Sequence, residues 1–102
     1  MKKYTHFATQ AIRTQEERTR REHSVPLYLT SSFVFDDAEQ ARALFADEYV
    51  DNIYSRFSNP NVNEFVDKMC VLEGMEDGFG TATGMAAVFA SIMPFLNAGD
   101  HI

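Results

Sequence analysis

The sequence has few of the features that mark secreted, membrane or nucleic-acid-binding proteins. It contains one cysteine, so no disulfide can form within the chain, and this usage is typical of a reducing compartment. No apolar run approaches the roughly 20 residues that a membrane-spanning helix needs. Basic residues are scarce: 9 Lys and Arg against 15 Asp and Glu give a formal net charge of -6, which argues against binding to nucleic acid. These absences predict a cytoplasmic protein that binds neither membranes nor nucleic acids.

The positive charges near the N-terminus do not change this prediction. Lys2 and Lys3 resemble the start of a signal peptide, but polar residues such as Thr5 and His6 follow where an apolar segment is required. The basic cluster at residues 18–21 lies in a polar stretch without aromatic residues. Short charge runs of this kind are usually solvated, so we expect a surface segment there.

The composition is that of a folded chain, with 45% hydrophobic and 24% charged residues. Apolar spacing predicts a short helix within residues 5–15, followed by a polar loop over 16–24. Residues 25–35 are rich in aromatic and β-branched side chains and predict an extended segment, from which Pro26 excludes a central-strand position. We expect this segment to be an arm that lies on another part of the protein.

Two positions match the capping-box pattern, in which Asp or Asn at a helix start is followed three residues later by Glu: Asp36 with Glu39, and Asn61 with Glu64. The first predicts a helix that ends near Phe45. The second predicts a helix that ends at Gly74 and carries one apolar face, formed by Val62, Phe65, Val66, Met69 and Leu72.

The last third of the chain predicts a buried strand–helix unit. Residues 78–83 are a strand candidate, and residues 84–96 are almost wholly apolar, which is typical of a buried helix that Pro94 would end or kink. Residues 97–100 predict a turn, and residues 101–102 the start of a second strand. One or two strands do not make a stable sheet, and so short a chain can hardly cover a wholly apolar helix. We therefore expect the chain to be part of a larger protein.

The first candidate site is the sequence TATGMAA at residues 81–87. A strand that runs into Gly84 and directly into a helix would offer unpaired backbone amides and the positive end of the helix dipole, which together favour a phosphate. The segment lacks both the Walker sequence and the three-glycine dinucleotide fingerprint. A plain strand-to-helix turn would explain the same residues.

The second candidate site is the sequence IYSR at residues 53–56. In an extended segment Tyr54 and Arg56 point to the same side, and a phenol beside a guanidinium group suits a phosphate. A half-buried tyrosine and a surface arginine in a loop would be the ordinary explanation.

The remaining reactive residue types suggest no other site. Cys70 lies on the apolar helix face without a histidine nearby and is predicted to be a core residue. The three histidines are too scattered for a metal site, and Glu76 and Asp77 are expected to be solvated loop residues.

Six blocks of the sequence, in this order, resemble the N-terminal part of the cystathionine γ-synthase family, the pyridoxal-phosphate (PLP) enzymes of cysteine and methionine metabolism. They are TQAIR (9–13), PLYLTSSFVF (26–35), IYSRFSNP (53–60), LEG (72–74), TGMAA (83–87) and GDHI (99–102). Within the family these sequence blocks are most similar to those of the O-acetylhomoserine and O-succinylhomoserine sulfhydrylases. Those enzymes make homocysteine from an acylated homoserine and sulfide in methionine biosynthesis.

The resemblance implies an α/β fold, namely the fold-type-I (aspartate-aminotransferase-like) architecture in truncated form. Residues 1–50 would be an N-terminal arm and helices involved in subunit contacts. Residues 51–102 would begin the large PLP-binding domain, which remains incomplete. Two departures are small: Asn61 stands where threonine often follows Asn-Pro, and Pro94 interrupts a helix that usually has no proline there.

The resemblance also assigns roles to the two candidate sites. Tyr54 and Arg56 would reach the PLP phosphate of the neighbouring subunit, and the Tyr54 phenol would lie near the substrate and assist proton transfer. The backbone amides of Gly84 and Met85 would hold the phosphate of their own subunit. One chain would thus serve two active sites, which implies a dimer or a dimer of dimers (a homotetramer) that acts on a small amino-acid substrate.

No catalytic residue is expected in this segment. Lys2, Lys3 and Lys68 are the lysines of the chain, and none matches the position of the family lysine that bonds the cofactor. The chain alone should therefore be inactive. A cystathionine γ-synthase, or a methionine or cystathionine γ-lyase, of the same family is the nearest alternative. A non-catalytic acidic module that binds partners through residues 25–35 is the alternative of another class, and it predicts a monomer that folds by itself.

Overall fold

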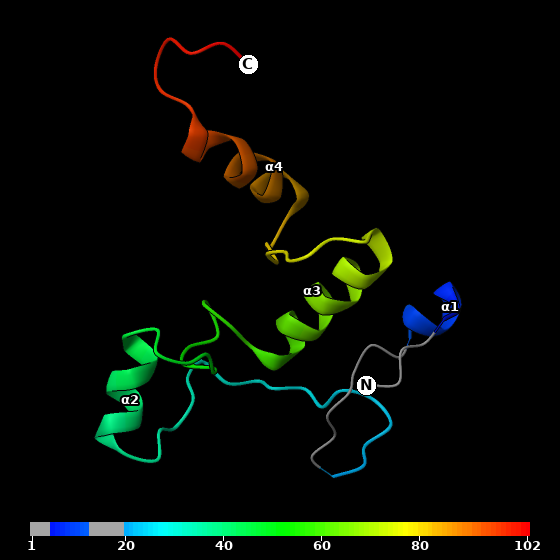
Figure 1. Cartoon of the computed structure of the whole chain (residues 1–102), viewed down its shortest axis with the longest axis vertical. Helices are drawn as coiled ribbons and strands as arrows, with labels where there is room; N and C mark the ends of the chain where they lie inside the picture. The colour runs from blue at the N-terminus through cyan, green and yellow to red at the C-terminus, as the bar shows by residue number, and fades with distance from the viewer. Residues whose placement is uncertain (1–4, 13–19) are drawn as a thin grey trace.

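The chain folds into short helices joined by long extended segments (Figure 1). The computed structural model describes residues 5–12 and 20–102. Within these ranges the helices are α1 (Phe7–Gln10), α2 (Ala38–Phe45), α3 (Pro60–Glu73), α4 (Gly84–Ile92) and the 3-10 helix η1 (Met93–Phe95). The predicted N-terminal helix is confirmed at α1. The loop expected over 16–24 lies partly outside the described residues.

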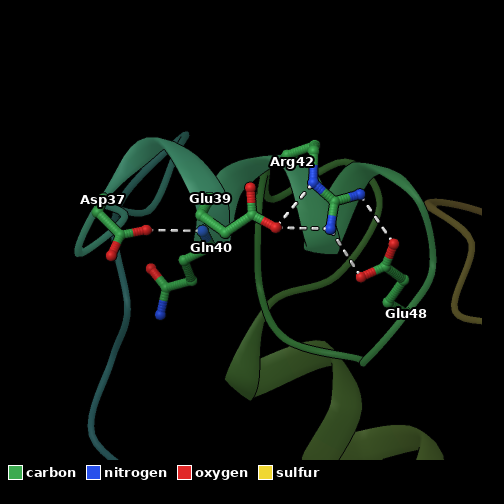
Figure 2. Close-up of polar contacts among 5 residues, drawn as sticks. All are labelled: Asp37, Glu39, Gln40, Arg42 and Glu48. Atoms are coloured by element: carbon green, nitrogen blue, oxygen red, sulfur yellow. Dashed lines mark hydrogen bonds and ion pairs between the residues drawn. The ribbon is translucent and has the colours of Figure 1, made fainter.

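Helix α2 begins one residue later than the predicted capping box. Asp37 is the N-cap, and its Oδ1 accepts the Gln40 N–H at 2.7 Å (Figure 2). The side chain of Gln40 reaches back and accepts the Asp36 N–H at 2.5 Å. The pairing of Asp36 with Glu39 is therefore wrong. Asp37 keeps an extended backbone and takes the capping position, while Glu39 binds Arg42 instead.

Helix α2 ends in a Schellman motif without glycine. Asp47 adopts a positive φ of 55°, its N–H donates to the Leu44 oxygen at 3.2 Å, and the Glu48 N–H donates to the Ala43 oxygen at 3.0 Å. Asn and Asp tolerate this left-handed conformation better than most residues, although glycine is usual.

The guanidinium group of Arg42 binds one carboxylate in the first turn of α2 and another just after the helix ends (Figure 2). It binds Glu39 at 2.7 Å and Glu48 at 2.8 Å. The bond to Arg42 lowers the pKa of the Glu48 carboxyl below its ordinary value. The hydrogen bond to Glu48, and to a smaller extent the one to Glu39, raises the pKa of Arg42. All three side chains are exposed, so the cluster is a group of surface ion pairs.

Helix α3 begins at Pro60, with Asn59 as its N-cap. The Asn59 Oδ1 accepts the Asn61 N–H at 2.9 Å. The predicted cap at Asn61 is therefore wrong, because Pro60 suits the first helical position, where its missing N–H is not needed. The predicted end is confirmed: Gly74 has a φ of 67°, in the left-handed region.

The strand expected over 78–83 does not form among the described residues, which offer it no partner strand. The segment instead lies along α3. A Cβ built on Gly80 would be 2.9 Å from Val62 Cγ1, and one built on Gly78 would be 3.2 Å from Val66 Cγ1. The two glycines let the backbone approach the apolar face of α3. The segment that makes this contact connects α3 to α4.

Helix α4 ends at Ile92 and is followed by η1, which contains Pro94, so the predicted interruption is confirmed. The turn at 97–100 is also confirmed, since the Asp100 N–H donates to the Asn97 oxygen at 3.1 Å. The strand expected at 101–102 does not form. Among the helices, α4 contacts η1 alone and stands away from α3 (Figure 1).

The predicted burial of α4 is not seen within the described part of the chain. Met85 is 74% exposed and Phe89 is 63% exposed. Leu44, at 4% exposure, is the one buried hydrophobic residue among those described. The radius of gyration is 17.0 Å, whereas a compact domain of 100 residues has about 13 Å. The helices thus do not share a common core.

Candidate functional site

The arm predicted over residues 25–35 lies against the second candidate site. An antiparallel bridge joins Ser32 to Tyr54, and the flanking residues form two main-chain hydrogen bonds of 3.1 and 2.9 Å. The Ser55 hydroxyl donates a further bond to the Thr30 carbonyl oxygen. The extended arm is thus confirmed, and it fixes the backbone on which Tyr54 stands.

The structure brings Tyr54 and Arg56 together, as the sequence predicts. The guanidinium carbon of Arg56 lies 5.3 Å from the centroid of the Tyr54 ring and 5.3 Å from that of the Phe57 ring. The backbone turns directly after Tyr54, whose carbonyl oxygen accepts the Phe57 N–H at 2.8 Å. Stacking within this turn, and not an extended backbone alone, therefore places the two side chains side by side.

The charge of Arg56 is available for an anion. Arg56 forms no ion pair with any residue in the described part of the chain, in contrast to Arg42. Tyr54 beside it is 39% exposed. An exposed phenol and an uncompensated guanidinium group are suitable donors for a phosphate. Phe57 is not among the residues predicted from the sequence, where its one signal is that an aromatic residue directly follows the arginine.

The first candidate site has the free amides that the sequence predicts. Thr83 is the N-cap of α4: its Oγ1 accepts the Ala86 N–H at 3.1 Å, and its carbonyl oxygen accepts the Ala87 N–H at 3.2 Å. The N–H groups of Gly84 and Met85 are left without a hydrogen-bond partner among the described residues. A Cβ built on Gly84 meets nothing within 4 Å, so no other described side chain crowds the start of the helix.

The two candidate sites remain apart within one chain. A hollow beside Arg56 is lined by residues of α3 and by residues 77–80, and neither Gly84 nor Met85 is among its lining residues. Its lining includes Asp67 and Asp77, two carboxylates that would repel a phosphate there. The assignment of the two sites to two different cofactors stays a prediction, as do the roles of their residues.

The described residues contain no other constellation of reactive groups. Cys70 is half-buried on α3, where its sulfur would lie 3.3 Å from a Cβ built on Gly78, as expected of a packing residue. No group of three or more metal-ligating side chains occurs within 5–12 and 20–102. No helix in the same ranges has the length and apolar character needed to cross a bilayer.

Comparison with known proteins supports the resemblance seen in the sequence. The family model for Cys/Met metabolism PLP-dependent enzymes matches residues 8–102. An O-succinylhomoserine sulfhydrylase of Pseudomonas aeruginosa is 43% identical over 97 residues, which are 94% of this chain and 24% of that protein. An L-methionine gamma-lyase of Porphyromonas gingivalis is 42% identical over 79 residues, 78% of this chain and 20% of the relative.

A solved structure agrees. A crystal structure from Campylobacter jejuni, assigned as an O-acetylhomoserine (thiol)-lyase and containing N′-pyridoxyl-lysine-5′-monophosphate, matches with a TM-score of 0.87 at 33% identity. The match covers 95% of this chain and 24% of that one. The chain thus spans about a quarter of the length of these relatives. These findings favour the enzyme hypothesis over the interaction module and confirm the predicted fold class and cofactor. The chain belongs to the Cys/Met metabolism family of PLP-dependent enzymes.

Proposed function

We propose that these 102 residues are the N-terminal part of a PLP-dependent sulfhydrylase. The enzyme would make homocysteine from O-acetylhomoserine or O-succinylhomoserine and sulfide, in methionine biosynthesis. The observation that carries this proposal is the start of α4, where two amides have no hydrogen-bond partner among the described residues, in a chain of a PLP-dependent family. The similarity to an O-succinylhomoserine sulfhydrylase over 94% of the chain supports the choice of reaction.

The donors in this chain fit the phosphate of PLP. Gly84 and Met85 offer two N–H groups at the positive end of a helix, and this environment stabilises an anion. In our proposal they hold the phosphate of their own subunit. Tyr54 and Arg56 offer a hydroxyl and a guanidinium group to the phosphate of the neighbouring subunit. The exposed Tyr54 phenol also stands ready to move a proton at the substrate.

PLP, when bound, supplies an electron sink for the charge that develops on the substrate carbon. The residues of this chain hold the cofactor and orient it. The group that bonds the cofactor would come from another part of the protein, because none of the three lysines of the chain stands at the corresponding position.

A chain that serves two cofactors needs a partner subunit, so we propose a dimer or a dimer of dimers in the cytoplasm. Residues 1–50 would contribute to subunit contacts, and residues 51–102 would begin the large PLP-binding domain. The exposed apolar side chains of the arm and of α4 support this arrangement, because surfaces of this kind normally lie in interfaces. Leu29, Val34, Met85 and Phe89 are among them.

A γ-lyase of the same family is a second candidate. It is supported by the L-methionine gamma-lyases of Porphyromonas gingivalis and Fusobacterium nucleatum, which are 42% and 39% identical over 79 residues. The complete protein distinguishes the two activities. Sulfide-dependent formation of homocysteine from an acylated homoserine supports the sulfhydrylase, and release of a thiol from methionine in the absence of sulfide supports the lyase.

The phosphate role is tested by Arg56→Ala in the complete protein, with Arg42→Ala as the control for loss of a surface arginine. We expect Arg56→Ala to raise the dissociation constant for PLP, because a charged donor to the phosphate is lost. Arg42→Ala should leave it unchanged, since Arg42 is engaged by Glu39 and Glu48. Unchanged cofactor affinity in Arg56→Ala would remove Arg56 from the site.

A further inference from the structure

Two asparagines next to the second candidate site bind the backbone of the arm. The Asn61 side chain accepts the Tyr28 N–H at 2.8 Å and donates to the Pro26 carbonyl oxygen at 2.7 Å. The Asn59 Nδ2 donates to the Tyr28 carbonyl oxygen at 3.1 Å. Both main-chain groups of Tyr28 are thus satisfied by side-chain amides, which here replace a neighbouring strand.

Asn59 differs from Asn61 in its burial and in its contacts. It is 7% exposed and is the one buried polar residue among those described. Its Oδ1 caps α3, and its Nδ2 donates to the Ser55 Oγ at 3.0 Å in addition to Tyr28. Ser55 lies between Tyr54 and Arg56 in the sequence, and its own hydroxyl donates to the Thr30 carbonyl. A buried amide with several partners holds one geometry, because each broken bond would leave a buried polar group unpaired.

We propose that Asn59 is a positioning residue for the phosphate contacts of Tyr54 and Arg56. This inference rests on the proposed function, in which those two residues bind the cofactor phosphate. Asn59 holds Ser55 against the arm and the start of α3, and this fixes the backbone on which Tyr54 and Arg56 stack. Through Asn59 the arm thereby supports the phosphate site.

The variant Asn59→Asp isolates this role. Asp caps a helix as well as Asn does, so the start of α3 is kept. The substitution preserves the shape of the side chain and removes both donors, to Ser55 and to Tyr28. Asn61→Asp is the matched control: it removes one amide donor and adds the same charge two residues away, but Asn61 has no bond to Ser55.

The readout compares two probes, PLP and pyridoxal, which lacks the phosphate, bound to the complete protein. We expect Asn59→Asp to weaken PLP binding about tenfold, as the loss of one or two hydrogen bonds allows, and to leave pyridoxal binding nearly unchanged. Asn61→Asp should affect neither probe to this extent. An equal loss for PLP and pyridoxal would mean a general structural role and would overturn the inference. If Asn59→Asp does not fold, Ser55→Ala makes the same comparison through a smaller change.

A double variant separates this inference from the proposed function. If Asn59 acts through Arg56, Asn59→Asp should weaken PLP binding much less in the Arg56→Ala background than in the wild type. If the losses simply add while Arg56→Ala itself weakens PLP binding, the positioning role is wrong and the phosphate role of Arg56 stands. If Arg56→Ala leaves PLP binding unchanged, the phosphate role of Arg56 fails, and the inference fails with it.

Discussion

The side-chain amide of Asn59 donates a 3.1 Å hydrogen bond to the carbonyl oxygen of Tyr28, 31 residues earlier in the chain. Through this bond the N-terminal arm, the start of α3 and the segment around Tyr54 form one hydrogen-bonded unit. The free N–H groups of Gly84 and Met85, at the start of α4, lie on a different part of the chain.

The amide of Gly84 can be removed without disturbing α4. Gly84 is the first helical residue, where proline is favoured, and Thr83 before it has a φ of -147° and a ψ of 155°, which a following proline accepts. Gly84→Pro should therefore weaken PLP binding in the complete protein, by roughly tenfold for the loss of a donor to a charged group. Gly84→Ala keeps the amide and is the control. Equal affinities for the two variants, measured by cofactor titration, would exclude the amide.

Phe57 is expected to support Arg56. The Phe57 ring lies 5.3 Å from the guanidinium carbon, on which the Tyr54 ring also stacks. Phe57→Ala should weaken PLP binding by roughly two- to fivefold, as expected for loss of an exposed cation–π contact. Phe57→Tyr keeps an aromatic face and should bind as the wild type does. Identical affinity for PLP in Phe57→Ala and the wild type would show that the stacking does not matter.

Gly74 is required by the backbone at the end of α3. Its φ is +67°, and a Cβ at this position meets nothing within 4 Å, so the cost of a side chain is backbone strain alone. Gly74→Ala should lower stability by about 1 kcal/mol and reduce the thermal midpoint of the complete protein. Asp47→Gly is the reverse change, because Asp47 holds a φ of 55° at the end of α2, and it should raise the midpoint. The same midpoint in Gly74→Ala and the wild type would contradict this assignment.

The ion pair between Arg42 and Glu48 predicts that stability depends on pH. Because Arg42 lowers the pKa of Glu48, the folded value lies below the unfolded one. The contribution of the contact to stability is therefore present above the unfolded pKa and is lost as the pH falls through the folded value. Arg42→Gln should move the Glu48 pKa back toward its ordinary range in an NMR titration. A Glu48 pKa that is the same with and without Arg42 would show that the contact is not populated in solution.

Local signals in the sequence predicted local structure well. The end of α3 follows from the conformation of Gly74, the end of α4 from Pro94, and the free amides from a glycine at a helix start. The cap positions were displaced, because several adjacent Asp and Asn residues can cap and the pattern does not choose between them. The true caps are Asp37 and Asn59.

The sequence could not predict contacts between distant residues. The amides of Asn59 and Asn61 bind an arm that lies more than 30 residues away, and no spacing rule connects them. The strand expected over 78–83 needs a partner that the described residues do not contain, whereas Gly78 and Gly80 pack on α3. The contact of Arg56 with the two neighbouring rings depends on the turn after Tyr54, which the expectation of an extended segment does not include.

The central claim is that one chain serves two cofactors, its own through Gly84 and Met85 and that of its neighbour through Tyr54 and Arg56. A hybrid dimer of the complete protein, with Arg56→Ala in one subunit and Gly84→Pro in the other, tests it directly. If the claim holds, one site of the hybrid lacks both contacts and the other lacks neither. Cofactor titration should then find wild-type affinity at half of the sites, although neither parent homodimer has a site of that affinity. A hybrid with no site of wild-type affinity would show that both contacts of one chain serve the same cofactor, and would contradict the claim.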